Sequence, residues 1–153
     1  MGDGIMALFG VESGMAAGSR SALAAIIDLA EELKRVNRDL AAQLSGPLRI
    51  AVGLHGGSAI LGRIGLDGRN GVASGLTALG DVVNVASRLE GVAKEQNALA
   101  AISRDVLTAS GAGLDPFMPL LQVPIRGRLA PLDVACPTST APILLALDRA
   151  AAA

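Results

Sequence analysis

The sequence is poor in aromatic residues: its 153 residues include two Phe, no Trp and no Tyr. The core must therefore be built from Ala, Val, Leu and Ile. Proteins that bind single-stranded nucleic acid without sequence preference stack the bases on several aromatic side chains, which this chain cannot supply. Its formal net charge of -1 also gives no general attraction to DNA or to an anionic membrane. We therefore expect no nucleic-acid partner.

The chain has one cysteine, Cys136, and one histidine, His55. A single cysteine excludes an internal disulfide and a multi-cysteine zinc site, and a single histidine excludes a paired-histidine metal motif. Any metal would be held by oxygen ligands. Cys136 has no basic or histidine neighbour in the sequence, so we predict an unreactive thiol. We interpret His55, between a strand and a Gly-Gly turn, as structural.

Long apolar runs are also missing. Uncharged apolar segments such as residues 141–147 fall far short of the roughly 18–20 residues that a transmembrane helix needs. The N-terminus lacks the basic segment and apolar run of a signal peptide. We therefore expect a cytoplasmic chain with no membrane segment.

Apolar residues at three- and four-residue spacing predict amphipathic helices. One covers residues 21–44, and a second covers residues 80–93, with Asp81 at the N-terminal end that favours an acidic residue. A short helix over residues 103–107 has Ser103 as its cap.

Short apolar runs bounded by turn signals predict the strands. They lie at residues 48–54, 59–64, 99–102, 120–125 and 131–135. The turn signal Asp3-Gly4 precedes an apolar run at residues 5–9, which fits the second half of a hairpin. Residues 66–76 are rich in glycine and lack periodicity, which predicts a flexible loop.

This order of elements predicts an α+β sandwich in which helices pack on a mostly antiparallel sheet. The length fits one domain with a substantial core. We assign the domain to residues 1–136, and we expect the Ala- and Pro-rich tail, residues 137–153, to form no more than a frayed helix.

Asn84 and Arg88 stand four residues apart on the second long helix and therefore share a face. Two interpretations are open at this point. They are solvated surface residues, or the amide holds a ribose while the guanidinium one turn away neutralises a phosphate. Glu90 fits a surface salt-bridge partner.

Asp3 and Arg126 carry weaker signals. Asp3 fits simple turn chemistry, or a carboxylate presented to Mg²⁺, which prefers hard oxygen ligands. Arg126 precedes a glycine in a turn from which a cation can reach a phosphate, although exposed loop arginines usually do nothing specific. The phosphate-binding GxxxxGK[ST] loop, the dinucleotide GxGxxG motif and the serine hydrolase elbow are absent.

Taken in order, these segments resemble the catalytic domain of a class III nucleotide cyclase. MGDGIMALFG resembles the family's metal-aspartate hairpin, LRIAVGLHGGSAILGRIG its central strand pair, and TALGDVVNVASRLEGVAK its signature helix. ISRDVL and VPIRGRLAPLDV resemble the closing segments. The resemblance spans residues 1–135 and implies a ferredoxin-like cyclase sandwich.

The resemblance implies a role for five residues in forming cyclic AMP and pyrophosphate from ATP. Asp3 would be one of two aspartates that bind a pair of Mg²⁺ or Mn²⁺ ions. Thr77 would read the purine edge and weakly favour ATP over GTP, while Asn84 would orient the ribose. Arg88 would stabilise charge on the α-phosphate as the ribose 3′-hydroxyl attacks. Arg126 would grip the β- and γ-phosphates, where the family often has lysine.

The sequence departs from the family pattern at its start. The first strand with the first metal aspartate, the two helices after it and the purine-selecting lysine are absent. We therefore expect an N-terminally truncated cyclase domain that is inactive alone. Sites in the family are shared across a head-to-tail dimer, which implies a homodimer or a heterodimer with a complete cyclase domain. The alternatives are a degenerate, non-catalytic module that pairs with a complete partner, and a structural α+β domain without a nucleotide.

Overall fold

A computed structural model describes residues 4–68, 71–127 and 129–151, except for the side chains of residues 63–76. The helices are α1 (Gly14–Asp39), α2 (Asp81–Glu95), α3 (Arg104–Ser110), the short 3₁₀ helix η1 (Asp115–Phe117) and α4 (Ala141–Ala151). The strands are β1 (Val52–Leu54), β2 (Ile60–Gly68), β3 (Gly71–Leu79), β4 (Ala100–Ser103), β5 (Leu121–Val123) and β6 (Leu132–Ala135).

Four strands form the central sheet in the order β1-β4-β6-β5. β1 runs parallel to β4, with Gly53 opposite Ala101, whereas β6 is antiparallel to both β4 and β5. β2 and β3 form a separate antiparallel pair. The predicted α+β class with a mostly antiparallel sheet is therefore confirmed, but the two strands expected around Gly56-Gly57 belong to different sheets and do not pair.

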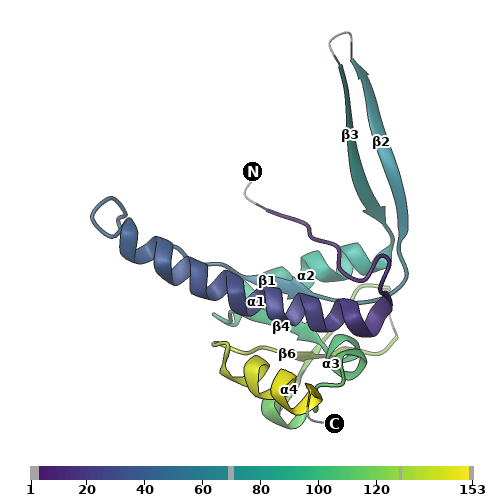
Figure 1. The fold of residues 1–153 in the computed structure, drawn as a ribbon. Coiled ribbons are helices and arrows are strands. Elements are labelled where there is room, and N and C mark those ends of the chain that lie inside the picture. The colour runs from purple at the N-terminus through teal and green to yellow at the C-terminus, as the bar shows by residue number, and fades with distance from the viewer. Residues whose placement is uncertain (1–3, 69–70, 128, 152–153) are drawn as a thin grey trace.

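The sheet separates two buried clusters, because successive residues of a strand point to opposite faces. Ala100 and Ile102 of β4 lie in one cluster, with residues of α1, α3 and α4. Ala101 between them lies in the other cluster, with Val85 and Leu89 of α2. The fold is thus a sheet with α2 on one face and with α1, α3, η1 and α4 on the opposite face (Figure 1).

The backbones of β1 and α2 pack directly against each other at Gly53. A Cβ atom added to Gly53 would lie 2.0 Å from the carbonyl oxygen of Ala86 and 2.3 Å from the amide nitrogen of Glu90. Ala51, two residues earlier on the same face, also packs against the α2 cluster. Small residues on this face of the sheet therefore allow the short distance between α2 and the sheet.

β2 and β3 form a long hairpin that extends away from the sheet and helices (Figure 1). The register is continuous from Ile60 opposite Leu79 to Gly68 opposite Gly71. The prediction of a flexible loop at residues 66–76 is therefore wrong. Local propensity indicated a loop because glycine is unfavourable in strands, whereas cross-strand pairing decides the structure.

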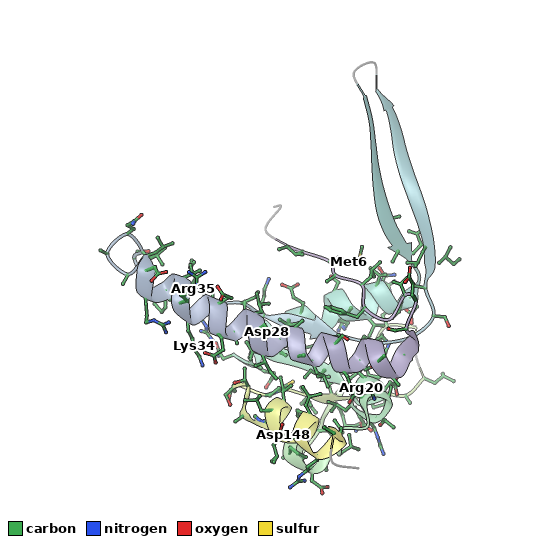
Figure 2. All side chains as sticks on the ribbon, in the orientation of Figure 1. Met6, Arg20, Asp28, Lys34, Arg35 and Asp148 are labelled. Carbon is green, nitrogen blue, oxygen red and sulfur yellow. The ribbon has the colours of Figure 1, made fainter. Side chains whose placement is uncertain are left out.

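The apolar run at residues 5–9 is not a strand, so the prediction of half a hairpin there is wrong for the described residues. The segment crosses the start of α1, where a Cβ atom on Gly18 would lie 2.5 Å from the Cα of Gly10. Its side chains are poorly covered: Ile5 is 95% exposed and Met6, labelled in Figure 2, is 51% exposed. An exposed apolar segment of this kind is a candidate contact surface.

α1 begins earlier and ends earlier than the predicted residues 21–44, and β1 is shorter than the predicted residues 48–54. Before β1, Asn37 of α1 holds the returning chain through two hydrogen bonds with the backbone of Leu48. The tail forms α4, whose Ile143 and Ala146 are fully buried against α1 and η1. The expectation of a frayed helix is therefore wrong, because the tail carries an apolar face that completes the core.

Candidate functional site

α2 presents the candidate polar residues on its outer face. Gly80, whose φ of 149° disfavours other residues, precedes the helix, and the acidic Asp81 occupies the first turn. Val85 and Leu89 are buried on the inner face, and Asn84 and Arg88 are exposed. The predicted helix is confirmed, and the i, i+4 spacing brings the amide and the guanidinium onto one solvent-facing surface.

Arg88 lacks an acidic neighbour along the helix. The residues three and four positions away are Asn84, Val85, Gly91 and Val92, none of which carries charge. Glu90 pairs instead with Lys94, at 2.5 Å between Oε1 and Nζ, which confirms its predicted role in a surface salt bridge. Within the described part of the chain, no hydrogen bond or ion pair is found for the side chains of Asn84 and Arg88. The guanidinium is therefore available to an anion.

Thr77 lies on β3, four residues before α2 begins, where it pairs with Gly62. Its side chain is partly exposed, whereas the next residue, Ala78, is only 4% exposed. Strand, turn and helix thus follow one another directly from Thr77 to Arg88. The chain connection is short, but among the described residues no hydrogen bond or ion pair joins the Thr77 side chain to Asn84 or Arg88.

Arg126 lies in an exposed turn after β5. Its neighbour Ile125 is buried in the same cluster as Val85 and Leu89 of α2. The turn is therefore anchored in the core beneath α2. In the parts of the chain that the structure describes, no hydrogen bond or ion pair links Arg126 to the polar face of α2.

The predicted metal ligand Asp3 lies outside the described residues. Among the residues that are described, no three His, Cys, Asp or Glu side chains gather where they could hold a metal ion.

His55 and Ser103 join the ends of two neighbouring strands. His55 Nδ1 lies 2.9 Å from Ser103 Oγ, and the Ser103 side chain is fully buried. This contact supports the structural interpretation of His55. Ser103 has the extended backbone of an N-cap residue before α3, but its hydroxyl contacts His55 and forms no capping hydrogen bond.

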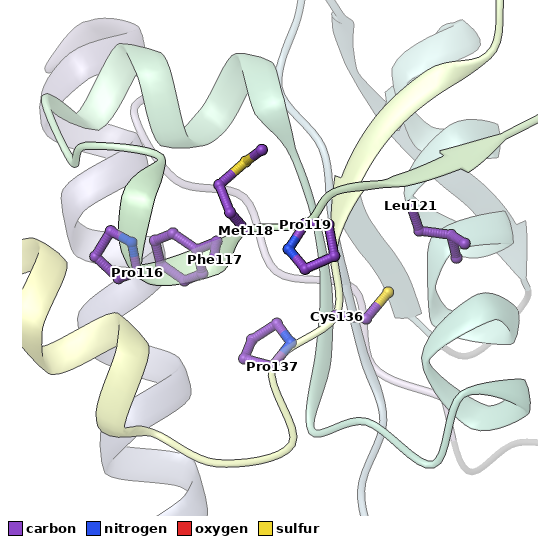
Figure 3. A pocket seen from close by; sticks show the side chains of 7 residues that line it. All are labelled: Pro116, Phe117, Met118, Pro119, Leu121, Cys136 and Pro137. Atoms are coloured by element: carbon purple, nitrogen blue, oxygen red, sulfur yellow. The ribbon is translucent and has the colours of Figure 1, made fainter.

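The described surface includes two shallow pockets that lie away from Thr77, Asn84 and Arg88. One, of about 260 Å³, is lined by Pro116, Phe117, Met118, Pro119, Leu121, Cys136 and Pro137 (Figure 3). The other, of about 250 Å³, has Arg49 and Lys94 among its lining residues. Burial raises the pKa of the Cys136 thiol, which agrees with the predicted low reactivity of this cysteine.

The close packing of Gly53 beneath α2 was not predicted from the sequence, which indicated only an alternating strand. The available signal was the pair of small residues at alternate positions, Ala51 and Gly53, on the face that meets a helix.

None of the helices in the described ranges combines the length and apolar character that crossing a bilayer requires.

Comparison with known proteins identifies relatives of this chain. The family model for the adenylate and guanylate cyclase catalytic domain matches residues 1–114. Adenylate cyclase 1 of Rhizobium meliloti (strain 1021) is 29% identical over 133 residues, which cover 87% of this chain and 19% of that protein. The adenylate cyclase of Anabaena cylindrica is 36% identical over 111 residues, covering 70% and 20%.

A third relative is the terminal-differentiation specific adenylate cyclase of Dictyostelium discoideum, 29% identical over 136 residues that cover 88% of this chain and 6% of that protein. The chain thus spans at most 20% of the length of these curated relatives. The family match includes α2 with Asn84 and Arg88, whereas Arg126 lies beyond it.

Proposed function

This chain belongs to the family of adenylate and guanylate cyclase catalytic domains, and from this we propose that it supplies part of an adenylate cyclase active site. The reaction is the conversion of ATP to cyclic AMP and pyrophosphate. One observation carries the proposal: within the matched region, α2 exposes Asn84 and Arg88 together, and no carboxylate stands three or four residues from Arg88, where a helical ion pair would form. Three relatives named as adenylate cyclases support ATP as the substrate.

The side chains of α2 would act on the ribose and the α-phosphate. The Asn84 amide can donate to and accept from ribose oxygens, so it can orient the sugar for attack by its 3′-hydroxyl. Negative charge grows on the α-phosphate oxygens as the new bond forms and pyrophosphate departs. Arg88 offers planar, paired N–H donors to these oxygens and would lower the energy of the transition state.

Thr77 and Arg126 would hold the two ends of the substrate. The Thr77 hydroxyl can accept a hydrogen bond from the exocyclic amino group of adenine, which favours ATP weakly because it can also act as a donor. Arg126, exposed in its turn, would pair with the β- and γ-phosphates. Asp3 would contribute to the binding of Mg²⁺ or Mn²⁺, an ion that neutralises the triphosphate when bound. The described residues offer no further acidic cluster for it.

We propose that a second cyclase domain completes the site, in a head-to-tail homodimer or in a heterodimer with a complete domain. Two features support a protein partner. An isolated two-stranded hairpin is only marginally stable in water, and β2–β3 extends from the body with Ile60 73% exposed and Leu79 59% exposed at its base. The segment before α1 adds the exposed side chains of Ile5 and Met6.

The test is a mixed-dimer assay. The partner is a complete cyclase domain that keeps its metal aspartates but carries alanine at the position equivalent to Arg88, so that it is inactive alone. We expect cyclic AMP to appear with ATP and Mn²⁺ or Mg²⁺ only when both chains are present, and little cyclic GMP to appear with GTP. Activity of this chain alone would contradict the proposed dependence on a partner. No activity with any partner would favour the degenerate or structural alternatives.

A further inference from the structure

The tightest contact between α2 and the sheet involves only backbone atoms. A Cβ atom at Gly53 would lie 2.0 Å from the Ala86 oxygen, 2.3 Å from the Glu90 nitrogen and 3.0 Å from the Glu90 Cα. Side-chain rotation cannot relieve contacts with backbone. A residue larger than glycine must therefore push α2 and β1 apart.

The contact lies on the opposite side of α2 from the candidate polar residues. Successive residues of an α-helix are about 100° apart, so Asn84 and Arg88, each two positions from Ala86, lie about 200° around the axis from it. A displacement of α2 away from β1 therefore moves Asn84 and Arg88 outward together. The height of the helix above the strand sets the position of both side chains.

We infer that Gly53 is a positioning residue for the nucleotide half-site, because it allows α2 to sit at the depth from which Asn84 and Arg88 reach the substrate. The inference rests on the proposed function for its effect on catalysis. Its paired residue Ala101 is also small and fully buried in the α2 cluster. The surface of the sheet beneath this part of α2 is therefore built from small residues of both β1 and β4.

The catalytic test compares two Gly→Ala variants in the mixed-dimer assay. In Gly53→Ala, the 2.0 Å contact must open to at least 3.0 Å, and a misplacement of about 1 Å can reduce a rate by about 100-fold. We expect kcat to fall by about that factor with a much smaller change in KM, because Arg88 acts mainly on the transition state. A variant with unchanged kcat would overturn the inference.

Gly91→Ala is the matched control. Gly91 also lies in this part of the molecule, on α2 itself, but a Cβ atom there meets nothing within 4 Å. We expect this variant to retain wild-type kcat and to unfold at a slightly higher temperature, because alanine is a better helix former than glycine. Equal losses of kcat in both variants would contradict a specific role for Gly53.

A structural measurement on the wild-type chain needs no activity. We expect a nuclear Overhauser effect between the Gly53 Hα atoms and the Glu90 amide proton, and its absence would refute the close approach. In Gly53→Ala, amides of α2 should exchange with solvent faster relative to those of α1, and unchanged relative rates would also refute the inference. If Gly53→Ala alone folds poorly, the same measurements are made on the double variant Gly53→Ala/Gly91→Ala, in which the second substitution stabilises α2.

These measurements separate the two proposals. If the Overhauser effect and the exchange rates are as expected while the wild-type chain restores no cyclase activity, Gly53 positions α2 but the proposed function is wrong. If wild-type activity appears and Gly53→Ala matches it, the function stands and the positioning role of Gly53 is wrong.

Discussion

α1 and α2 are both amphipathic helices with charged outer faces. They differ in that Lys34 and Arg35 of α1 form ion pairs within the helix, whereas Arg88 of α2 does not. On α1, Lys34 Nζ lies 2.8 Å from Glu31, Arg35 lies 2.7 Å from Glu32, and Arg35 also lies 3.6 Å from Asp39. Lys34 and Arg35 point outward from the part of α1 beyond the core (Figure 2). On α2, Arg88 has only Asn, Val and Gly at the helical neighbour positions.

The difference shows that exposure alone does not identify a functional cation. Glu32, through its hydrogen bond and its charge, and then Asp39 raise the pKa of Arg35, so this guanidinium is already surrounded by anionic partners. Arg88 is also exposed, but no acidic residue stands three or four positions away on its helix. We therefore interpret Lys34 and Arg35 of α1 as surface charges that are already paired, and substrate binding by Arg88 stays a prediction.

The largest expected effect is on the free energy of unfolding, and it tests how the inner face of α2 is packed compared with an exposed position of α1. Leu89 of α2 is fully buried, whereas Leu29 of α1 is 41% exposed. We expect Leu89→Ala to lower the free energy of unfolding by about 2–5 kcal/mol, the range for leucine truncation in a core. Leu29→Ala should cost much less. Denaturant titration of both variants measures the difference, and equal losses would mean that α2 is not packed as described.

The next effect concerns the exposed side of α2. We expect Arg88→Ala to reduce kcat in the mixed dimer by about 100-fold or more, as for removal of one donor to a transition-state anion. The control is Arg38→Ala on α1, another exposed arginine without an ion pair among the described residues. Steady-state kinetics should show wild-type rates for this control. A comparable loss in both variants would remove the distinction between the helices.

A carboxylate introduced beside Arg88 should make α2 resemble α1. Gly91→Glu places an acid at i+3, and the site is open because a Cβ atom there meets nothing within 4 Å. We expect about a tenfold lower kcat, since part of the guanidinium charge is neutralised before substrate binds. Gly91→Gln keeps the size without the charge and should retain the rate. If Gln impairs kcat as much as Glu, bulk and not charge is responsible.

The smallest effect is expected on α1. Arg35→Ala removes two exposed ion pairs, and pairs of this kind add little to stability because water and salt screen them. Cyclase activity in the mixed dimer should be unchanged, and the thermal unfolding midpoint should barely move. A marked loss of activity would show that α1 also contributes to the site or to the dimer.

Sequence patterns predicted the elements that local periodicity controls. α2 was expected at residues 80–93 and runs from Asp81 to Glu95, because apolar spacing and an acidic first turn agree. The strand expected at residues 59–64 is the first part of β2, whereas the rest of β2 and all of β3 were missed because their glycine-rich sequence has weak local propensity. The burial of Ile143 in α4 was missed because it depends on a surface formed by distant parts of the chain.

The candidate site was predictable in part. The spacing of Asn84 and Arg88 showed that they share a face, and the family resemblance assigned them to a nucleotide. The roles of Thr77 and Arg126 remain predictions, because these residues come from separate elements whose positions relative to a substrate depend on tertiary packing. The backbone contact at Gly53 could not be predicted from spacing, since the distance between β1 and α2 is set by the assembled core.

The most direct test of the central claim is nuclear magnetic resonance of the isotope-labelled chain in the mixed dimer, titrated with 3′-deoxy-ATP, which lacks the attacking hydroxyl. We expect saturable shifts of the Asn84 side-chain amide and the Arg88 Nε–H signals, with the Arg38 Nε–H signal unchanged. Saturation of the dimer by nucleotide while the Asn84 and Arg88 signals stay in place would contradict the claim that the outer face of α2 binds the substrate.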